Sequence, residues 1–426
     1  MNIVIIGNGI AGVTAAFRLR KLQPEWNITV ISGESDHHYS RPALMYIFMG
    51  HMRYEDTKPF EDHVWREQRI DLVRAWVTRI DTENKRVLLD GQTQPLGYDK
   101  LLIATGSSPN KFDWPGQDLD GVQSLYGLQD LDLLYRNVRD ARHAVVVGGG
   151  LIGIELAEML HSRNIDVTFL VRETAFWNIL IPEEEARMIN RIIEDEGLGL
   201  VLETELREIV DDGTGRVTGV ITSAGDRVDC QVVGLTTGVH PNVALAQSSG
   251  VPTARGILVD RGLRTQIDDV YAAGDCAEIV TGSECNLIQQ VWYTGRMQGN
   301  LVADVMAGAD AEYEAGIWFN SAKFLDLEYQ VYGAVPRTGG EAPGERSLLW
   351  QHPDGRKSVR IVFTGEGVTG FNLLGVRYRH EVCERWILER RPIDYVLDHL
   401  GEANFDPEFF ERHEREVAAS FKGQVA

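Results

Sequence analysis

Gly7-Asn8-Gly9-Ile10-Ala11-Gly12 and, far downstream, Gly148-Gly149-Gly150-Leu151-Ile152-Gly153 repeat one glycine pattern within the same chain. Each copy follows an apolar run, Ile3–Ile6 or Ala144–Val147, and precedes a stretch rich in alanine or leucine. A strand, a tight turn and a helix N-terminus in this order can hold a pyrophosphate, because glycine lets the backbone approach and free N–H groups meet the phosphate oxygens. One such motif can be an ordinary strand-to-helix turn, but two predict two dinucleotide-binding modules of α/β fold.

Length and composition indicate a globular protein of several domains. The 426 residues suffice for roughly two or three domains, and 43% of them are hydrophobic. The longest apolar runs fall well short of the ~18–20 residues that span a bilayer, and the chain starts with a strand pattern instead of a cleavable leader. We therefore expect a cytoplasmic protein without membrane insertion.

Charge and cysteine content exclude several functional classes. The net charge of −21, from 63 acidic and 42 basic residues, argues against nonspecific nucleic-acid binding and against adhesion to anionic membranes. The cysteines form no CxxC pair and show no metal-ligand spacing, so we expect neither a disulfide scaffold nor a metal site. They are Cys230, Cys276, Cys285 and Cys383.

The first module continues with a strand pattern at Asn27–Ile31. Dinucleotide folds commonly place an acid near the end of this second strand, where it binds the hydroxyl groups of a ribose. Glu34 is the nearest acid, so we assign it to the ribose; a solvated turn residue is the alternative. The segments Asp71–Ile80 and Arg86–Asp90 alternate like further strands.

Two later segments of the chain mirror one another. Tyr98–Ser107 is predicted to be a strand that ends in Ala104-Thr105-Gly106, where glycine lets the backbone pass close to a ligand. Gln231–Asn242 repeats this arrangement around Gly238. Next, a short apolar strand delivers Gly274-Asp275, whose carboxylate can accept a hydrogen bond from a sugar-alcohol hydroxyl group.

In this order the motifs resemble the pyridine nucleotide-disulfide oxidoreductase family, flavoproteins that bind two dinucleotides, over about residues 1–310. The resemblance implies that the first loop binds the ADP half of FAD, that Asp275 binds its ribityl or pyrophosphate region, and that the second loop binds NAD(P)H. It also implies backbone contact of Val77 with adenine and places Arg41 near the flavin. The predicted cofactor-binding residues are Gly7, Asn8, Gly9, Ile10, Ala11, Gly12, Glu34, Arg41, Val77, Ala104, Thr105, Gly106, Gly274, Asp275, Trp292, Gly148, Gly150, Leu151, Ile152, Gly153, Arg172 and Gly238.

The chemistry implied by the resemblance is hydride transfer from nicotinamide to flavin, followed by passage of the electrons to an acceptor. Glu155 lies where the family often has a glutamate that reaches the edge of the nicotinamide or flavin; a helix-capping or solvated acid is the alternative. The helix predicted at Gln289–Met306 carries Trp292-Tyr293 at its start, which the resemblance places against the flavin. Covering a domain junction is the other interpretation of this aromatic pair.

Two departures from the family pattern narrow the expected function. No cysteine precedes Cys230, so chemistry through an active-site thiol is not expected, and Cys276 is predicted to be a small buried residue. Tyr39–Leu44 is similar to the branch with ferredoxin, rubredoxin and putidaredoxin reductases and the reductase part of assimilatory nitrite reductases. Tyr46 falls where that branch has a lysine near the flavin, and it either shields the flavin or belongs to the core.

The choice of nicotinamide nucleotide depends on the end of the second module's second strand, Asp166–Leu170. NAD sites place an acid there, whereas NADP sites present arginine. Val171 occupies the acid position and Arg172 follows it, which favours NADPH. Glu173 either neutralises Arg172 or binds the ribose itself.

We predict three domains. An FAD-binding domain comprises residues 1–110 and 243–310, an NAD(P)H-binding domain with its connecting segment comprises 111–242, and a small α+β domain, which the resemblance makes a dimer interface, comprises 311–426. In the last domain, arginines interleave with acids and predict a salt-bridged solvated face in preference to a docking surface for an acidic carrier. These residues are Arg377, Arg379, Arg385, Arg390, Arg391, Glu381, Glu384 and Glu389.

The leading function is an FAD-dependent NAD(P)H oxidoreductase that donates electrons to a redox carrier such as ferredoxin or rubredoxin. The second interpretation is an NAD(P)H oxidase, or a reductase of quinones or other small acceptors. The third is a flavoprotein redox sensor in which NAD(P)H changes the association state. We expect a homodimer, with the nicotinamide dinucleotide and, in the leading function, a redox carrier protein as partners.

Overall fold

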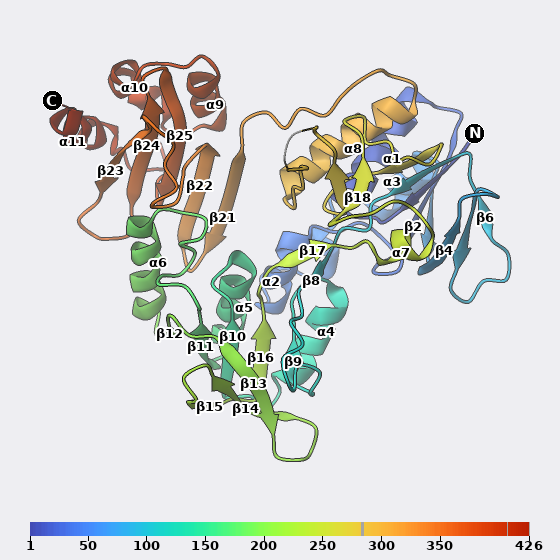
Figure 1. The fold of residues 1–426 in the computed structure, drawn as a ribbon, viewed down its shortest axis with the longest axis horizontal. Coiled ribbons are helices and arrows are strands. Elements are labelled where there is room, and N and C mark those ends of the chain that lie inside the picture. Colours follow the sequence, from blue (N-terminus) through green and yellow to red (C-terminus); the bar gives the residue numbers. More distant parts are fainter. Residues whose placement is uncertain (283–284, 407, 426) are drawn as a thin grey trace. The chain divides into compact units, whose positions relative to one another are not determined.

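The computed structural model describes residues 1–282, 285–406 and 408–425 and divides the chain into two compact units (Figure 1). Unit 1 comprises Met1–Asn110, Ser124–Arg136 and Gly238–Glu314, and unit 2 comprises Lys111–Gln123, Asn137–Thr237 and Ala315–Ala426. The predicted FAD-binding domain falls within unit 1. Unit 1 also takes Ser124–Arg136 from the predicted connecting segment, and unit 2 joins the second module to the C-terminal residues.

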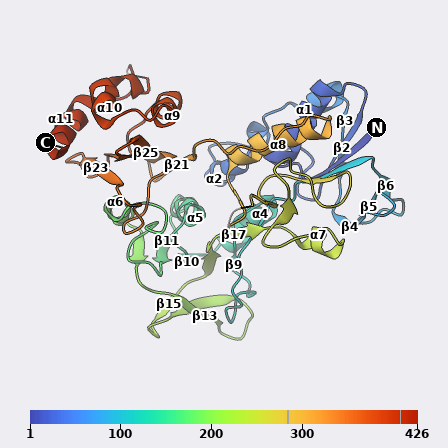
Figure 2. The same ribbon diagram turned by 45° about the horizontal axis from the view of Figure 1, so that its top comes forward.

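Unit 1 is built on a parallel sheet in the order β19-β7-β1-β2-β3. Its strands are β1 (Asn2–Ile6), β2 (Asn27–Ser32), β3 (Ile70–Arg74), β7 (Lys100–Ile103) and β19 (Val270–Ala272). Helices α1 (Ile10–Leu22) and α8 (Trp292–Met306) pack together, so closely that a Cβ on Gly299 would lie 2.5 Å from the carbonyl oxygen of Ala11 (Figures 1 and 2). This is the first of the two predicted dinucleotide modules.

The smaller elements of unit 1 include a three-stranded antiparallel sheet and two short strand pairs. They are β4 (Val77–Asp81), β5 (Arg86–Leu89) and β6 (Leu96–Gly97), the antiparallel pair β8 (Ser107–Pro109) and β17 (Val239–Pro241), and the parallel pair β18 (Ile257–Val259) and β20 (Ala277–Ile279). Its short helices are α2 (Leu44–Phe48), α3 (Asp62–Glu67) and α7 (Ala244–Ser248), the 3₁₀ turns Arg41–Ala43 and Tyr54–Thr57, and most of α4 (Leu128–Asn137).

The segment Asp71–Ile80, which alternates like a strand, is divided between two strands, β3 and β4, in the structure. After β3 the N–H of Ala75 still donates to the carbonyl of Ser32, and then the chain leaves the parallel sheet and pairs as β4 with β5. The break falls at Ala75 and Trp76, in the middle of an alternating pattern that carries no turn residue.

The second dinucleotide module, in unit 2, has a parallel sheet in the order β12-β11-β10-β16-β9. Its strands are β9 (Val122–Gln123), β10 (His143–Val147), β11 (Asp166–Leu170), β12 (Gly199–Val201) and β16 (Val232–Leu235). Helices α5 (Leu151–His161) and α6 (Glu183–Asp195) connect its strands, and β13 (Leu206–Asp211), β14 (Val217–Thr222) and β15 (Arg227–Asp229) form a small antiparallel sheet. Both predicted α/β modules are thus confirmed.

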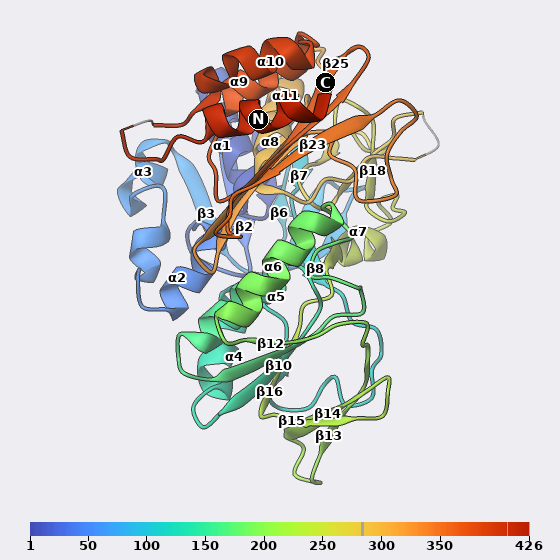
Figure 3. The same ribbon diagram turned by 90° about the vertical axis from the view of Figure 1, so that its left-hand side faces the viewer.

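The C-terminal part is α+β, as predicted. Its antiparallel sheet has the order β21-β22-β25-β24-β23, formed by Phe319–Phe324, Leu327–Gly333, Gly367–Leu374, Ser358–Thr364 and Arg346–Gln351. One core joins Ile361 and Phe371 of the sheet to Trp386 and Phe421 of the helices. The helices that cover this face are α9 (His380–Leu388), α10 (Ile393–His399) and α11 (Glu414–Val425), with a 3₁₀ turn at Leu400–Ala403 (Figure 3).

A buried ion pair joins the C-terminal sheet to the second module within unit 2. The guanidinium of Arg360, on β24, donates to both carboxylate oxygens of Glu185 on α6, at 2.6 and 2.8 Å. Asn372 donates to the same carboxylate at 3.3 Å. Ring contacts of Trp177 with Phe324 and Tyr329 join the same two parts, which form one compact unit.

Four of the five arginines predicted to form a salt-bridged face in the C-terminal part are salt-bridged. Most of their acidic partners nevertheless come from outside the predicted set, because the fold brings distant segments together. The pairs are Arg377–Glu328, Arg385–Glu402, Arg390–Glu366 and Arg391–Glu389.

Candidate dinucleotide sites

The first glycine loop has the geometry of a phosphate cradle. Gly7 has a φ of +112°, and a Cβ there would lie 2.1 Å from the carbonyl oxygen of Ala104; a Cβ on Gly12 would lie 2.1 Å from that of Gly7. At Gly9, by contrast, a Cβ would meet no atom of the described chain within 4 Å beyond its own neighbours. Helix α1 starts at Ile10 without a side-chain cap from the described residues and without an acid in its first turn. The N-terminus of α1 therefore borders open space within the described chain, and the loop has room for a pyrophosphate.

The second glycine loop repeats this arrangement in unit 2. Gly148 has a φ of +121°, and a Cβ there would lie 2.6 Å from the carbonyl oxygen of Thr236, whereas Gly150 again borders open space within the described chain. A Cβ on Gly153 would lie 2.8 Å from Oγ1 of Thr236. Helix α5 begins at Leu151 and Ile152 with no side-chain cap among the described residues. This loop likewise has room for a pyrophosphate.

Asn8, predicted to bind the cofactor, uses its side chain to fix the loop. Its Nδ2 donates to the carbonyl and hydroxyl oxygens of Ser35, at 3.1 and 3.0 Å. Nδ1 of the buried His38 lies 2.7 Å from the carbonyl oxygen of Asn8, and burial lowers the pKa of His38. Asn8 thereby ties the loop to the segment after β2.

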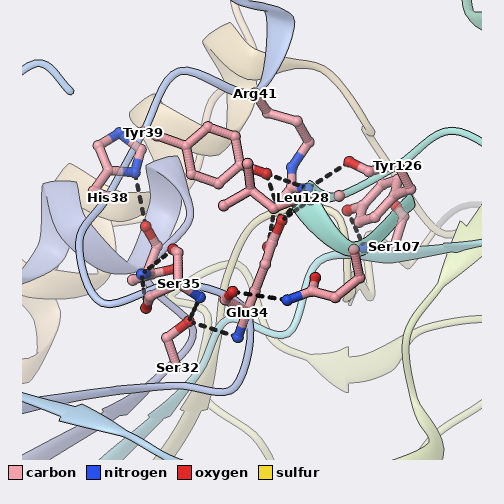
Figure 4. Close-up of polar contacts among 12 residues, drawn as sticks. Ser32, Glu34, Ser35, His38, Tyr39, Arg41, Ser107, Tyr126 and Leu128 are labelled. Carbon is pink, nitrogen blue, oxygen red and sulfur yellow. Dashed lines mark hydrogen bonds and ion pairs between the residues drawn. The ribbon is translucent and has the colours of Figure 1, made fainter. Parts of the chain in front are cut away.

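Glu34 and Arg41, assigned separately to the ribose and to the flavin surroundings, form an ion pair (Figure 4). Arg41 donates to both carboxylate oxygens of Glu34, at 3.0 and 2.6 Å, and Tyr39 donates to one of them. The N–H of Leu128, on α4, donates to Glu34 at 3.2 Å, and Arg41 also donates to the carbonyl oxygen of Tyr126 at 2.5 Å. Burial alone would raise the pKa of Glu34, but the hydrogen bonds and charge of Arg41 lower it, so Glu34 stays ionised.

Asp275 is held by two side chains that the sequence motifs do not mark. The hydroxyl group of Ser107 donates to Oδ2 of Asp275 at 2.9 Å, and Nε2 of Gln290 donates to that hydroxyl at 2.7 Å. The N–H of Ser107 donates to the phenol oxygen of Tyr126 at 2.8 Å (Figure 4). Burial raises the pKa of Asp275, and the Ser107 hydrogen bond opposes this shift. The one sequence signal for Ser107 is that it directly follows Ala104-Thr105-Gly106.

The glycines beside these groups take conformations that favour glycine. Gly106, Gly274 and Gly238 have φ values of +69°, +82° and +88°. The N–H of Gly274 donates to Oε1 of the buried Gln298 at 2.7 Å, and the hydroxyl group of Thr105 donates to the carbonyl oxygen of Asn242 at 2.8 Å. These bonds fix the ends of β7 and β19, where the motifs predicted cofactor contacts.

The remaining residues predicted to lie near the FAD belong to unit 1. Ala11 is in the first turn of α1, Val77 opens β4, and Tyr46 lies in α2 with its ring 6.2 Å from that of His51. Trp292 opens α8 in T-shaped contact with Tyr293, at 5.5 Å between ring centroids. Their contacts with the cofactor stay predictions.

Arg172 and Glu173 lie directly after β11 and pair with one another. Nε of Arg172 donates to Oε1 of Glu173 at 2.7 Å. The arginine side chain is 69% exposed and that of the glutamate 18%. The guanidinium is therefore the accessible member of the pair.

Cys276 is fully buried, as predicted, and burial raises the pKa of its thiol. Its Sγ lies 3.5 Å from the carbonyl oxygens of Ile103 and Ala273. Among the described residues, no group of three or more His, Cys, Asp or Glu side chains could hold a metal ion. Nor does any helix in the described parts have the length and hydropathy needed to cross a membrane.

Glu155 lies half-buried on α5, with Glu158 one turn further on. Burial raises the pKa of Glu155 to about 7, and the charge of Glu158 adds to the shift. Its pKa in the unfolded chain is near 4.3. At a pH between these two pKa values, Glu155 is protonated in the folded state but ionised in the unfolded state. The free energy of unfolding therefore falls as the pH rises across this window.

We expect Glu155→Gln to remove this loss of stability. The melting temperature of the variant minus that of the wild type should be near zero at pH 5 and should rise by on the order of 2 °C by pH 8. Thermal denaturation at four pH values measures this difference. Glu194→Gln, at an exposed position on α6, is the control and should show no such trend. A constant difference for Glu155→Gln would contradict the prediction.

Comparisons with known proteins identify the family. The profile described as "Pyridine nucleotide-disulphide oxidoreductase" matches residues 1–299. The chain is 30% identical over 378 residues to nitrite reductase [NAD(P)H] of Bacillus subtilis, covering 88% of this chain but only 45% of that protein. It is 28% identical over 403 residues to an NADH oxidase of Methanocaldococcus jannaschii, covering 88% of each chain. A rubredoxin-NAD(+) reductase of Acinetobacter baylyi is 31% identical over 65% of this chain and 72% of its own length.

A solved structure shows the same fold. The NAD-dependent persulfide reductase from A. fulgidus aligns with a TM-score of 0.87 at 24% identity, over 100% of this chain and 83% of that one. Both glycine loops lie within the residues that this profile matches. The chain belongs to the pyridine nucleotide-disulphide oxidoreductase family, a family of FAD-dependent NAD(P)H oxidoreductases.

Proposed function

We propose that this protein passes electrons from NAD(P)H, through FAD, to a redox carrier protein such as ferredoxin or rubredoxin. The observation that carries the proposal is the pair of open glycine loops in a chain without any cysteine before Cys230. Two dinucleotides can bind, but no thiol is placed in the sequence to receive the electrons, so the acceptor must come from outside. Two relatives, nitrite reductase [NAD(P)H] and rubredoxin-NAD(+) reductase, support a carrier protein or a further redox centre as the electron acceptor.

In this proposal unit 1 holds FAD and unit 2 holds NAD(P)H. Gly7, Gly9 and the α1 N-terminus would bind the FAD pyrophosphate, while Asp275 would accept a hydrogen bond from the sugar-alcohol chain. Bound FAD would supply the chemistry that takes a hydride and releases single electrons. The protein's contribution is to bind, orient and shield the two cofactors.

Anaerobic stopped-flow mixing tests the proposal. NADPH or NADH should bleach the flavin absorbance, and oxidised rubredoxin or ferredoxin added in a second mixing step should restore it. No bleaching with either nucleotide would contradict the oxidoreductase proposal as a whole.

We propose that the protein is a homodimer. Light scattering on the same sample tests this assembly.

The second candidate is an NAD(P)H oxidase or a reductase of small acceptors. The observation that favours it is the NADH oxidase relative, which matches over 88% of both chains. Restored absorbance with oxygen or a quinone at low micromolar concentration, but not with either carrier protein, would select this candidate.

We propose NADPH as the preferred nucleotide, because the exposed Arg172 is free to meet a 2′-phosphate at its outer nitrogens. Arg172→Ala should lower kcat/KM for NADPH roughly 10- to 100-fold and change that for NADH much less. Arg187→Ala is the control, since Arg187 is also 69% exposed and paired with a glutamate. If the wild type instead prefers NADH and Glu173→Ala removes that preference, Glu173 and not Arg172 contacts the ribose of the nucleotide.

A further inference from the structure

A tryptophan ring lies flat on a glycine at the carboxyl edge of the unit 1 sheet. A Cβ on Gly33 would lie 2.1, 2.4 and 2.4 Å from three fused-ring atoms of Trp76, Cδ2, Cε2 and Cε3. Such similar distances mean that one face of the indole covers the Cα of Gly33. Trp76 is nevertheless 61% exposed, so the opposite face of the ring is open.

The backbone around this ring is fixed on both sides. The N–H of Ala75 donates to the carbonyl of Ser32 at 3.0 Å, and the N–H of Asp90 donates to the carbonyl of Trp76 at 2.8 Å. Val77 pairs with Leu89 in the next sheet. An exposed indole held in one place is a ready surface for a flat ligand.

The position of the ring selects the ligand. The pyrophosphate cradle follows β1, and the acid Glu34 follows β2, so these two groups run across the sheet toward β3. The ribose of a nucleotide lies between its phosphate and its base, so a dinucleotide laid along this line has its base beyond Glu34, toward β3. Trp76 lies between β3 and β4, two residues after the end of β3, and its ring covers the residue that precedes Glu34.

We infer that the open face of Trp76 stacks on the adenine base of the bound FAD. The inference depends on FAD binding to unit 1, as the proposed function states. Stacking of aromatic side chains on bases is favourable whatever the base, because each base has a π face. Gly33 is then required because a side chain there would displace the indole from beneath the base.

Cofactor titration of the full-length apoprotein tests this inference. Trp76→Ala should raise the dissociation constant of FAD by about 5- to 100-fold, whereas Trp76→Phe should restore most of the affinity. FMN lacks the adenine half, so its affinity should be the same in the wild type and in all variants. Trp318→Ala is the control, since Trp318 is a 40% exposed tryptophan of unit 2.

The outcomes separate this inference from the proposed function. Wild-type apoprotein that fails to bind FAD would contradict the proposed function. Normal FAD binding by Trp76→Ala, or an equal loss of FMN binding, would overturn the stacking alone. Should Trp76→Ala fail to fold, as judged by its denaturation midpoint, Trp76→Leu against Trp76→Phe makes the same comparison, because both retain apolar cover over Gly33.

Discussion

Gly148→Ala should leave FAD bound but slow flavin reduction by NAD(P)H at least about 100-fold. Gly148 has a φ of +121°, which an L-residue rarely adopts, and its Cβ would lie 2.6 Å from the carbonyl oxygen of Thr236. The loop must therefore shift, and the N–H groups of α5 shift with it. Because hydride transfer needs the two rings at contact distance, a displacement of about 1 Å is enough to cause such a loss.

Stopped-flow measurement of the reduction rate over a range of nucleotide concentrations tests this result. Dithionite should still reduce the variant, which shows that the flavin remains intact. Gly225→Ala is the matched control: Gly225 also lies in unit 2 with a positive φ of +93°, but its Cβ would meet no described atom within 4 Å. Equal losses in both variants would mean that strain in any loop, and not the phosphate cradle, slows the reaction.

Most of the fold could be predicted because local sequence patterns indicate it. The apolar runs before the glycine loops, Ile3–Ile6 and Ala144–Val147, lie in the observed central strands β1 and β10 of the two parallel sheets. The pattern at Asp71–Ile80 does not mark the boundary between β3 and β4, because alternation continues across the turn at Ala75 and Trp76. The change of partner, from β2 to β5, is decided by tertiary contacts that no local pattern records.

The site shows the same division between local and distant contacts. The glycine loops are local, and the structure places each as expected. The bond from Leu128 to Glu34 joins residues 94 positions apart, and that from Gln290 to Ser107 joins residues 183 apart. Sequence motifs could therefore identify Glu34 and Asp275 as acids in suitable places, but not the groups that orient them.

Asp275→Ala should weaken FAD binding and lower the FAD content of the purified protein. Asp275 is half-buried and its carboxylate accepts the hydrogen bond of Ser107, so its removal would delete one proposed cofactor contact and would leave the Ser107 hydroxyl without this acceptor. A hydrogen bond to a charged group contributes about 1.5–3 kcal/mol, which corresponds to a rise in the FAD dissociation constant of roughly 10- to 150-fold. The FAD content after dialysis, and titration of the apoprotein with FAD, measure this loss.

Ser107→Ala separates orientation of Asp275 from its charge. This variant keeps the carboxylate but removes the donor that directs it, so we expect a smaller rise in the dissociation constant, about 3- to 10-fold. Asp304→Ala is the control in the same unit, because the Asp304 carboxylate pairs with Arg18 at the surface and such pairs contribute about 0–1 kcal/mol. If Ser107→Ala binds FAD as tightly as the wild type, Asp275 does not depend on this hydrogen bond. If Asp275→Ala also retains FAD, the glycine cradle and the residues after β2 hold the cofactor without it.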